Sequence, residues 1–321
     1  MDRAGNGARR DLWPLVAAVL AITVFPAAIR AALSGPVAST WVTIMLSVTV
    51  QAAPFLVLGV LVSGALAAFV PVGLIARRMP RRAAISVPMA GLVAAALPGC
   101  ECSSVVVAGR LLRSGVPSAP AVAFLLAAPA INPVVLVATA VAFPGQPRVV
   151  AARSVASLLT ALAVGWVWGR TGGEVACHAA RRPVGSGRGR LATFADTLVQ
   201  DFTSAGAYLA IGAAATATLQ VTPRPTAAQA LRSTGLLGIL VLAVMAVVLC
   251  VCSEADAFVA ATLTQFSTSA RLAFMVVGPV VDLKLIALEA GTFGPRFAAR
   301  FAPLVFMVAL ASSILVGALL L

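Results

Sequence analysis

Long apolar runs, separated by short breaks rich in Arg, Gly and Pro, recur along the whole chain. A run of about 20 apolar residues is long enough to cross the hydrocarbon core of a bilayer as a helix. The pattern therefore predicts an all-α polytopic membrane protein. Its spanning helices are expected at 12–33, 41–70, 118–143, 149–168, 194–219, 271–292 and 301–321.

Two further apolar segments are longer and are interrupted near their middles. They cover 83–113, with a break at 97–104, and 235–266, with a break at 250–256. Pro98 and Gly99 explain the first interruption, and a run of polar residues indicates the second. Because a backbone interruption in hydrocarbon is tolerated only where protein or a water-filled cavity satisfies its polar groups, functional residues are expected at both breaks.

Several residues of the first half recur in the second half at a constant offset of 150 residues. Cys100 and Cys102 recur as Cys250 and Cys252. The same offset relates Ala123-Phe124 to Ala273-Phe274, Pro129 to Pro279 and Asn132 to Asp282. The repetition predicts two homologous halves. The expected organisation is a tail with one extra N-terminal helix (1–40), repeat 1 (41–169), a basic cytoplasmic loop (170–193) and repeat 2 (194–321).

The arginines favour one orientation of these halves. If each broken segment is a re-entrant hairpin, the arginines that flank the first break and those of the basic loop all fall on the cytoplasmic side, as the positive-inside rule requires. The second half then runs in the opposite sense, which is an inverted-topology repeat. This arrangement is preferred to a parallel, fully spanning one. It places the N-terminus in the cytoplasm.

Composition agrees with a membrane protein. Hydrophobic residues make up 61% of the chain and charged residues 10%, whereas a soluble domain carries roughly 25% charged residues. The net charge of +13 comes from basic residues that lie mostly in the connections, so no nucleic-acid partner is expected. The expected partners are the lipid bilayer and a small solute, and a homo-oligomer is compatible with the sequence. No cofactor and no enzymatic activity are expected. The chain has no phosphate-binding G-x-x-x-x-G-K-[ST] motif, so it is not expected to be driven by ATP directly unless a partner supplies that function.

Four of the five cysteines lie in the two breaks. If the halves are related by a pseudo-two-fold axis, Cys100, Cys102, Cys250 and Cys252 converge. Converging thiols suit a soft species such as Cu(I), Zn(II) or trivalent arsenic, so these residues are candidates for substrate binding or metal binding. Simple packing of small apolar side chains and thiol redox chemistry remain open alternatives.

Carboxylates also gather in or beside the breaks. They are Glu101, Glu254, Asp256 and Asp282. A carboxylate near the bilayer centre costs on the order of 3 kcal/mol, so these groups are candidates for proton coupling, or else they cap helices or pair with cations. Lys284 is the expected counter-charge of Asp282. Side chains at positions i and i+2 of a helix diverge by about 200°, so that pairing requires unwinding near Pro279.

Asn132 follows Pro129 within an apolar run. A proline kinks a spanning helix and frees a carbonyl, and a polar residue three positions later can reach a cavity from that kink. Asn132 is therefore a candidate to line the solute path, with plain packing of a kinked helix as the alternative.

Three segments of the chain resemble one protein family: Pro98-Gly99-Cys100-Glu101-Cys102-Ser103-Ser104, Gly109 to Pro117, and Ala123 to Pro133. The family is the predicted permeases that include the organoarsenical efflux permeases, and the resemblance covers the chain after the first helix. It implies a plasma-membrane permease, and some members export trivalent organoarsenicals by secondary transport. Glu101 departs from the usual Cys-Ser-Cys of the family and weakens any transfer of arsenical specificity.

The sequence thus predicts a secondary-transport permease that exports a small thiophilic solute, coupled to protons. An ion channel or metal-ion permease and a membrane thiol-redox protein remain the alternatives.

Overall fold

The computed structural model describes residues 36–70, 74–80, 82–96, 100–171, 190–221 and 235–321. All regular secondary structure in these residues is helical. The predicted helix at 12–33, Pro98, Gly99 and the central part of the basic loop lie outside the described residues. Four helical stretches are long and apolar enough to cross a membrane: Val37–Phe69, Ser118–Ala142, Pro147–Thr171 and Pro295–Leu320. Each overlaps a span expected from the sequence.

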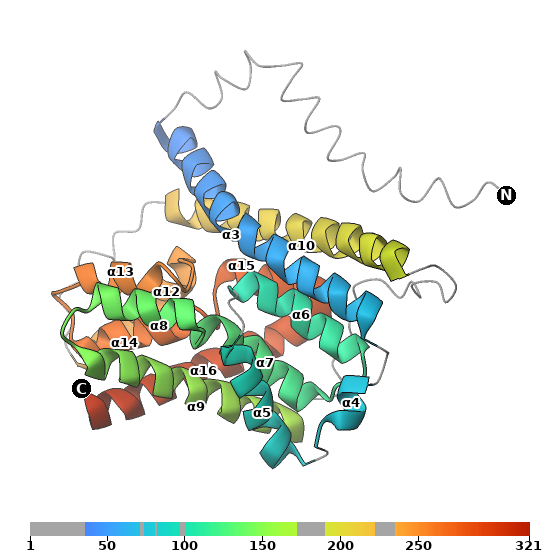
Figure 1. The fold of residues 1–321 in the computed structure, drawn as a ribbon. Coiled ribbons are helices and arrows are strands. Elements are labelled where there is room, and N and C mark those ends of the chain that lie inside the picture. Colours follow the sequence, from blue (N-terminus) through green and yellow to red (C-terminus); the bar gives the residue numbers. More distant parts are fainter. Residues whose placement is uncertain (1–35, 71–73, 81, 97–99, 172–189, 222–234) are drawn as a thin grey trace.

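Two long helices form one side of the molecule. Helix α3 (Pro36–Phe69) and helix α10 (Arg190–Val221) lie side by side and cross over the remaining helices (Figure 1). Large apolar side chains of α3 are exposed, with Leu46 60% and Val50 62% accessible. An apolar surface of this kind on a helix of spanning length is the surface that lipid covers.

The rest of the first half is a chain of shorter helices that ends in one long helix. They are α4 (Leu74–Arg78), α5 (Ala83–Ala95), α6 (Glu101–Arg113), α7 (Ser118–Ala130), α8 (Pro133–Ala142) and α9 (Pro147–Thr171). Helix α5 packs on α7, and α7 packs on α9. Helix α6 packs between α3 and α7, so the first break of the sequence lies inside the bundle.

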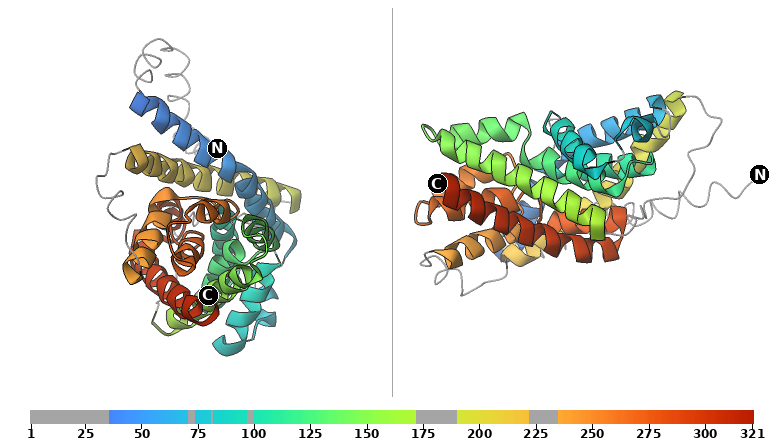
Figure 2. Two further views of the ribbon diagram at one scale, coloured as in Figure 1. Left: turned by 90° about the vertical axis from the view of Figure 1, so that its left-hand side faces the viewer. Right: turned by 90° about the horizontal axis from the view of Figure 1, so that it is seen from below.

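The second half has a similar order of short helices and one long final helix. They are α12 (Leu236–Leu249), α13 (Asp256–Thr262), α14 (Thr268–Val277), α15 (Leu283–Phe293) and α16 (Pro295–Leu320). Helix α12 packs on α14, and α14 packs on α16. The final helices of the halves, α9 and α16, lie against each other (Figure 2). Besides the contact of α3 with α10, the halves also meet where α6 contacts α15 and α10, where α8 contacts α13, and where α9 contacts α14.

Both breaks expected from the sequence separate helices in the structure. The first lies between α5 and α6, and the second between α12 and α13. Helix α12 ends at Cys250, which has a left-handed backbone with φ of 50°. Left-handed backbone is unfavourable for a residue with a side chain, so the chain turns sharply at this cysteine.

Two segments expected as single kinked spans are each divided into two helices. The segment 118–143 is divided after α7, and 271–292 is divided between α14 and α15. In the first, Pro133 disfavours helical backbone at the preceding residue, and the Asn132 side chain then caps α8. In the second, Asp282 caps α15 in the same way. Each half therefore contains two interruptions.

Glycines allow the α3–α10 pair to approach the interrupted helices. A Cβ atom on Gly59 of α3 would lie 2.6 Å from Cα of Ser103 in α6. A Cβ atom on Gly212 of α10 would lie 2.6 Å from Cα of Lys284 in α15. Small residues at such crossings are typical of helix packing in membranes. The two contacts hold α6 and α15 against the α3–α10 pair, so that the first turns of α6 and α15 lie inside the bundle.

Candidate functional site

Lys284 lies at the centre of a buried cluster formed by both halves. Its Nζ atom is 2.6 Å from Oε1 of Glu101 and 3.3 Å from Oδ2 of Asp282. The same amine donates to the carbonyl oxygen of Cys250 at 3.1 Å and contacts Sγ of Cys252 at 3.6 Å. Lys284 is only 1% exposed. One ammonium group therefore joins the first break, through Glu101, to the second break, through the two cysteines.

Asp282 and Lys284 form the ion pair expected from the sequence, and the required unwinding is present. Helix α14 ends at Val277, and α15 begins only at Leu283. Asp282 precedes α15, and its Oδ1 accepts a hydrogen bond from the Leu285 N–H at 2.6 Å. One carboxylate oxygen thus caps the helix while the other lies beside the lysine.

The first break places its thiols on both sides of Glu101. Cys100 immediately precedes α6, and Glu101 and Cys102 form its first turn. Both thiols are fully buried. The hydroxyls of Ser103 and Ser104 donate to the backbone carbonyls of Cys100 and Glu101, each at 2.8 Å. These bonds hold the first turn of α6 in place with its carboxylate directed at Lys284.

The second break is held by polar contacts from several helices. Thr216 of α10 donates its hydroxyl to Sγ of Cys250 at 3.1 Å. Ser253 donates from Oγ to Oε2 of Glu101 at 3.4 Å, which is a second link between the two breaks. Gln220 donates to the carbonyl of Leu249 at 2.9 Å. The loop between α12 and α13 is therefore fixed at both its thiol end and its serine.

Asp256 does not belong to the lysine cluster. Its Oδ2 atom is 2.7 Å from Nη2 of Arg153, a residue of α9 that is completely buried. The same Nη2 donates to the carbonyl of Ser253 at 3.1 Å, and Nη1 donates to Oγ1 of Thr139 at 2.7 Å. Sequence reasoning missed Arg153 because the arginines were treated as charges of the connections. Its position inside an apolar run was the available signal, since an arginine there costs about 2.5–3.5 kcal/mol to insert.

Several buried carboxylate oxygens lack a hydrogen-bond partner among the described residues, including those of Glu254 and Glu289. Neither oxygen of Glu254 has a hydrogen-bond partner among the described residues, although the residue is adjacent to Ser253 in the second break. Glu289 of α15 is 2% exposed, and its Oε1 also lacks a partner in the described part of the chain. Glu289 was not predicted, although an acidic residue within an apolar run is the same signal that identified the other carboxylates.

The Asn132 side chain forms hydrogen bonds with the backbone on both sides of the interruption between α7 and α8. Its Oδ1 accepts from the Val135 N–H at 2.9 Å, and its Nδ2 donates to the Ala128 carbonyl at 3.0 Å. The side chain therefore caps α8 and satisfies a carbonyl at the end of α7. Asn132 and Asp282, related by the offset of 150 residues, both precede a helix and accept from the N–H three positions later. Helix capping therefore explains why the polar side chain of Asn132 is buried.

The matched family covers nearly all of the described chain. The family model described as "Predicted permease" matches residues 38–318. The chain belongs to this permease family. The permease is 33% identical to the UPF0718 protein YcgR of Bacillus subtilis over 284 residues, which cover 85% of this chain and 96% of that protein. It is 28% identical to a Streptococcus mutans protein over 282 residues, which cover 85% and 94% of the two chains.

The Streptococcus mutans protein carries the description "Putative two-component membrane permease complex subunit". No solved structure matches the permease. Family membership confirms the resemblance found in the sequence. It makes the protein a multi-pass membrane permease, and hence a transporter with a solute and a lipid bilayer as partners.

The thiols of the permease are free, and they are not arranged as a finished metal site. Cys100, Cys102, Cys250 and Cys252 are all buried free cysteines. In the described residues, no three His, Cys, Asp or Glu side chains are placed to hold a metal ion together. In this conformation the Lys284 ammonium lies between Glu101 of the first break and the Cys252 thiol of the second.

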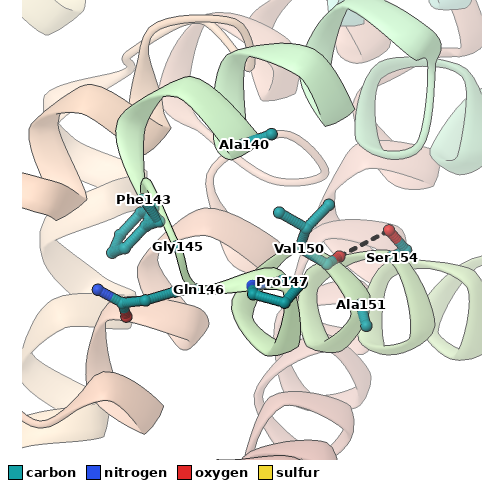
Figure 3. A pocket seen from close by; sticks show the side chains of 8 residues that line it. All are labelled: Ala140, Phe143, Gly145, Gln146, Pro147, Val150, Ala151 and Ser154. Carbon is teal, nitrogen blue, oxygen red and sulfur yellow. Dashed lines mark hydrogen bonds between the residues drawn. The ribbon is translucent and has the colours of Figure 1, made fainter.

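An open pocket of the permease lies apart from the thiols. It has a volume of about 460 Å³ and surrounds the turn between α8 and α9 (Figure 3). Its lining includes Phe143, Gln146 and Ser154, and it contains none of the site residues expected from the sequence. Ala140 and Ser154 in its wall are the chain neighbours of Thr139 and Arg153, which are both buried. The charged side chains of the lysine cluster itself are buried.

Proposed function

We propose that the permease exports a small thiophilic solute, such as a trivalent organoarsenical or a soft metal species, by secondary transport coupled to protons. Cys100, Cys102, Cys250 and Cys252 would bind the solute. The observation that carries this proposal is the position of Lys284 Nζ, which is 2.6 Å from Glu101 and 3.6 Å from the Cys252 thiol. The lysine amine thus contacts both the Cys252 thiol of the second break and Glu101, which stands between Cys100 and Cys102 in the first break.

In the proposed transport cycle, the Lys284 amine occupies the site beside Cys252 when no solute is bound. In the closed state its ammonium neutralises Glu101 and Asp282. When a soft cation or a polarised arsenic centre reaches the thiols, the amine would have to leave its place at Cys252. Because thiolates and not thiols bind such species, binding releases protons. Nearby carboxylates could accept them, which links solute binding to proton movement.

The carboxylates of the proposal have different roles. Glu101 and Asp282 contact the lysine directly and would exchange its charge for protons. Glu254, without a partner among the described residues, is free to bind a proton or a cation. Asp256 is neutralised by Arg153, so it would act in coupling only if that pair opened. Asn132, placed on the solute path by the sequence argument, would contribute by fixing the interruption between α7 and α8.

We also propose two inverted repeats that move against each other. The order of contacts α5–α7–α9 in the first half is matched by α12–α14–α16 in the second. The contact of α6 with α15 is matched by that of α13 with α8. Correspondence of this kind supports a pseudo-two-fold relation between 41–169 and 194–321. Rocking of one half around a site at the repeat interface is the usual mechanism of such transporters.

Everted membrane vesicles test the proposal directly. Vesicles that contain the permease are expected to accumulate a trivalent organoarsenical or a soft metal ion from a tested panel, and an imposed pH gradient should change the rate. Cys100→Ser should abolish accumulation, while Cys177→Ser, which removes the fifth cysteine outside the breaks, should leave it unchanged. Equal accumulation by wild type and Cys100→Ser would refute thiol binding.

The same assay separates the alternative functions. Flux that ignores the pH gradient and carries current favours a channel, and thiols that cycle with an electron donor favour a redox protein. Since one relative is described as a subunit of a two-component complex, vesicles from the native host are compared with vesicles that contain this chain alone. Activity only in the native vesicles would indicate a second subunit.

A further inference from the structure

Two buried ion pairs join the halves of the permease in opposite directions. Lys284 of the second half is paired with Glu101 in the first break. Arg153 of the first half is paired with Asp256, directly after the second break. All four side chains are at most 1% exposed. The proposed function uses the first pair, whereas nothing in that proposal requires Arg153.

The guanidinium of Arg153 does more than neutralise one carboxylate. Its Nη2 reaches both Oδ2 of Asp256, at 2.7 Å, and the carbonyl of Ser253, at 3.1 Å. Its Nη1 donates to Thr139 of α8 at 2.7 Å. A planar guanidinium presents several donors in a fixed geometry, and the compact ammonium of lysine cannot reproduce this set. Arg153 therefore ties α8, α9 and the second break together.

The position of this tie matters for the thiols. Ser253 follows Cys252 in the chain, and its hydroxyl donates to Glu101 while its carbonyl accepts from Arg153. Ser253 thus lies between the arginine on one side and the lysine cluster on the other. If the arginine is lost, the loop from Cys250 to Ala255 loses the contact that fixes its far end.

We propose that Arg153 is a positioning residue for transport, which holds the second break against the first half and so sets the place of the Cys252 thiol beside Lys284 and Glu101. The inference rests on the proposed function, and it extends that function to a residue that does not touch the solute. Arg153 acts through Ser253 and Asp256. Its effect should therefore appear first as a change in the accessibility of Cys252.

The test measures how fast a maleimide labels Cys252 in purified full-length protein that retains this single cysteine. Cys252 is buried, so labelling requires local opening of the break. Arg153→Lys should increase the labelling rate about tenfold, which corresponds to about 1.4 kcal/mol in the opening equilibrium. Arg170→Lys is the matched control, because Arg170 is an exposed arginine of the same helix. Its labelling rate should equal that of the unchanged protein.

A double variant separates positioning from charge neutralisation. Arg153→Gln alone leaves Asp256 as an uncompensated buried charge and should reduce the yield of folded protein. Arg153→Gln with Asp256→Asn removes both charges and should restore folded protein. In the single-cysteine protein Cys252 should still be labelled faster, and in protein that keeps all five cysteines vesicle transport should stay reduced. Full recovery of both slow labelling and transport in the double variant would overturn the proposal, because charge neutralisation alone would then suffice.

Failure of the proposed function gives a different result. If wild-type vesicles move none of the tested solutes, the labelling rates still show whether Arg153 holds the break. Unchanged labelling in Arg153→Lys refutes the positioning role whatever the solute is.

Discussion

Replacement of Lys284 by Met removes the cation that pairs with Glu101 and Asp282 among the described residues. At an effective dielectric constant of about 20, the 2.6 Å contact with Glu101 is worth about 6 kcal/mol before the cost of taking both charges out of water. The two carboxylates would then share a buried site without a counter-charge. Breaking a buried ion pair by removal of one partner typically costs 3–5 kcal/mol.

Proton uptake limits this cost. One additional proton can replace the lost positive charge, and at pH 7 its uptake by an ordinary glutamic acid costs about 3.7 kcal/mol, at 1.36 kcal/mol per pH unit. Lys284→Met should therefore be less stable than wild type by about 4 kcal/mol. At about 2–4 °C per kcal/mol, its thermal midpoint in detergent should fall by on the order of 10 °C.

The pH dependence has a definite sign. The extra proton is bound in the folded variant and released on unfolding, so acid favours the folded state of the variant relative to wild type. Between pH 7 and pH 5 the difference in stability should shrink by up to about 2.7 kcal/mol. Lys284→Met combined with Glu101→Gln is the matched control. It needs no extra proton, so its difference from wild type should be smaller and nearly independent of pH.

A thermal midpoint of Lys284→Met within 2 °C of wild type at pH 7 would refute the reasoning, using the same conversion. So would a midpoint difference that stays constant between pH 7 and pH 5.

Three further substitutions test neighbouring parts of the account. Glu254→Gln should change the unfolding midpoint little, because neither oxygen has a partner among the described residues, but it should alter the pH dependence of vesicle transport if Glu254 binds a coupling proton; an unchanged pH profile excludes that role. Asn132→Ala should lower the stability by about 1 kcal/mol through loss of the α8 cap, measured as the unfolding midpoint, and no change would show that the cap is dispensable. Gly212→Ala should displace Lys284 and lower both stability and transport, because its Cβ would lie 2.6 Å from Lys284 Cα, whereas Gly206→Ala meets nothing within 4 Å and should be neutral; equal effects of the two would contradict the close approach of α10 and α15.

The sequence predicted those parts of the site that cost free energy to place in a membrane, namely the helix breaks and the buried charges. The breaks at Cys100 and Cys250 separate helices, and the pairing of Lys284 with Asp282 is present together with the unwinding that it needs. These followed because interrupted backbone and buried charge are both expensive in hydrocarbon. The same argument applied to Arg153 and Glu289 would have found them as well.

Contacts between distant segments could not be predicted. The offset of 150 residues relates Cys100 to Cys250, yet Cys100 precedes a helix and Cys250 ends one with left-handed backbone. The sequence repeat gives no sign of this difference. The same holds for Glu101, whose closest cation is a lysine far along the chain. Its partner is set by tertiary packing and not by the sequence around the break.

The interruptions at Asn132 and Asp282 were expected only as kinks. Proline predicts that a helix bends, but whether it ends depends on a cap for the next helix. Both side chains supply that cap by accepting the N–H three residues later. The sequence signal was present as a polar residue before the new helix.

The proposal that thiols of the two breaks bind one solute together beside Lys284 can be tested by bridging them. Full-length protein that retains only Cys100 and Cys252 is treated with a trivalent phenylarsenical, which has two sites for sulfur, and washed with a competing monothiol. Mass spectrometry of the intact protein then counts what remains bound. The account predicts one arsenical per chain, retained through the wash, and none on variants that carry either cysteine alone. Retention by the two-cysteine protein that is no better than that of the single-cysteine variants would contradict it.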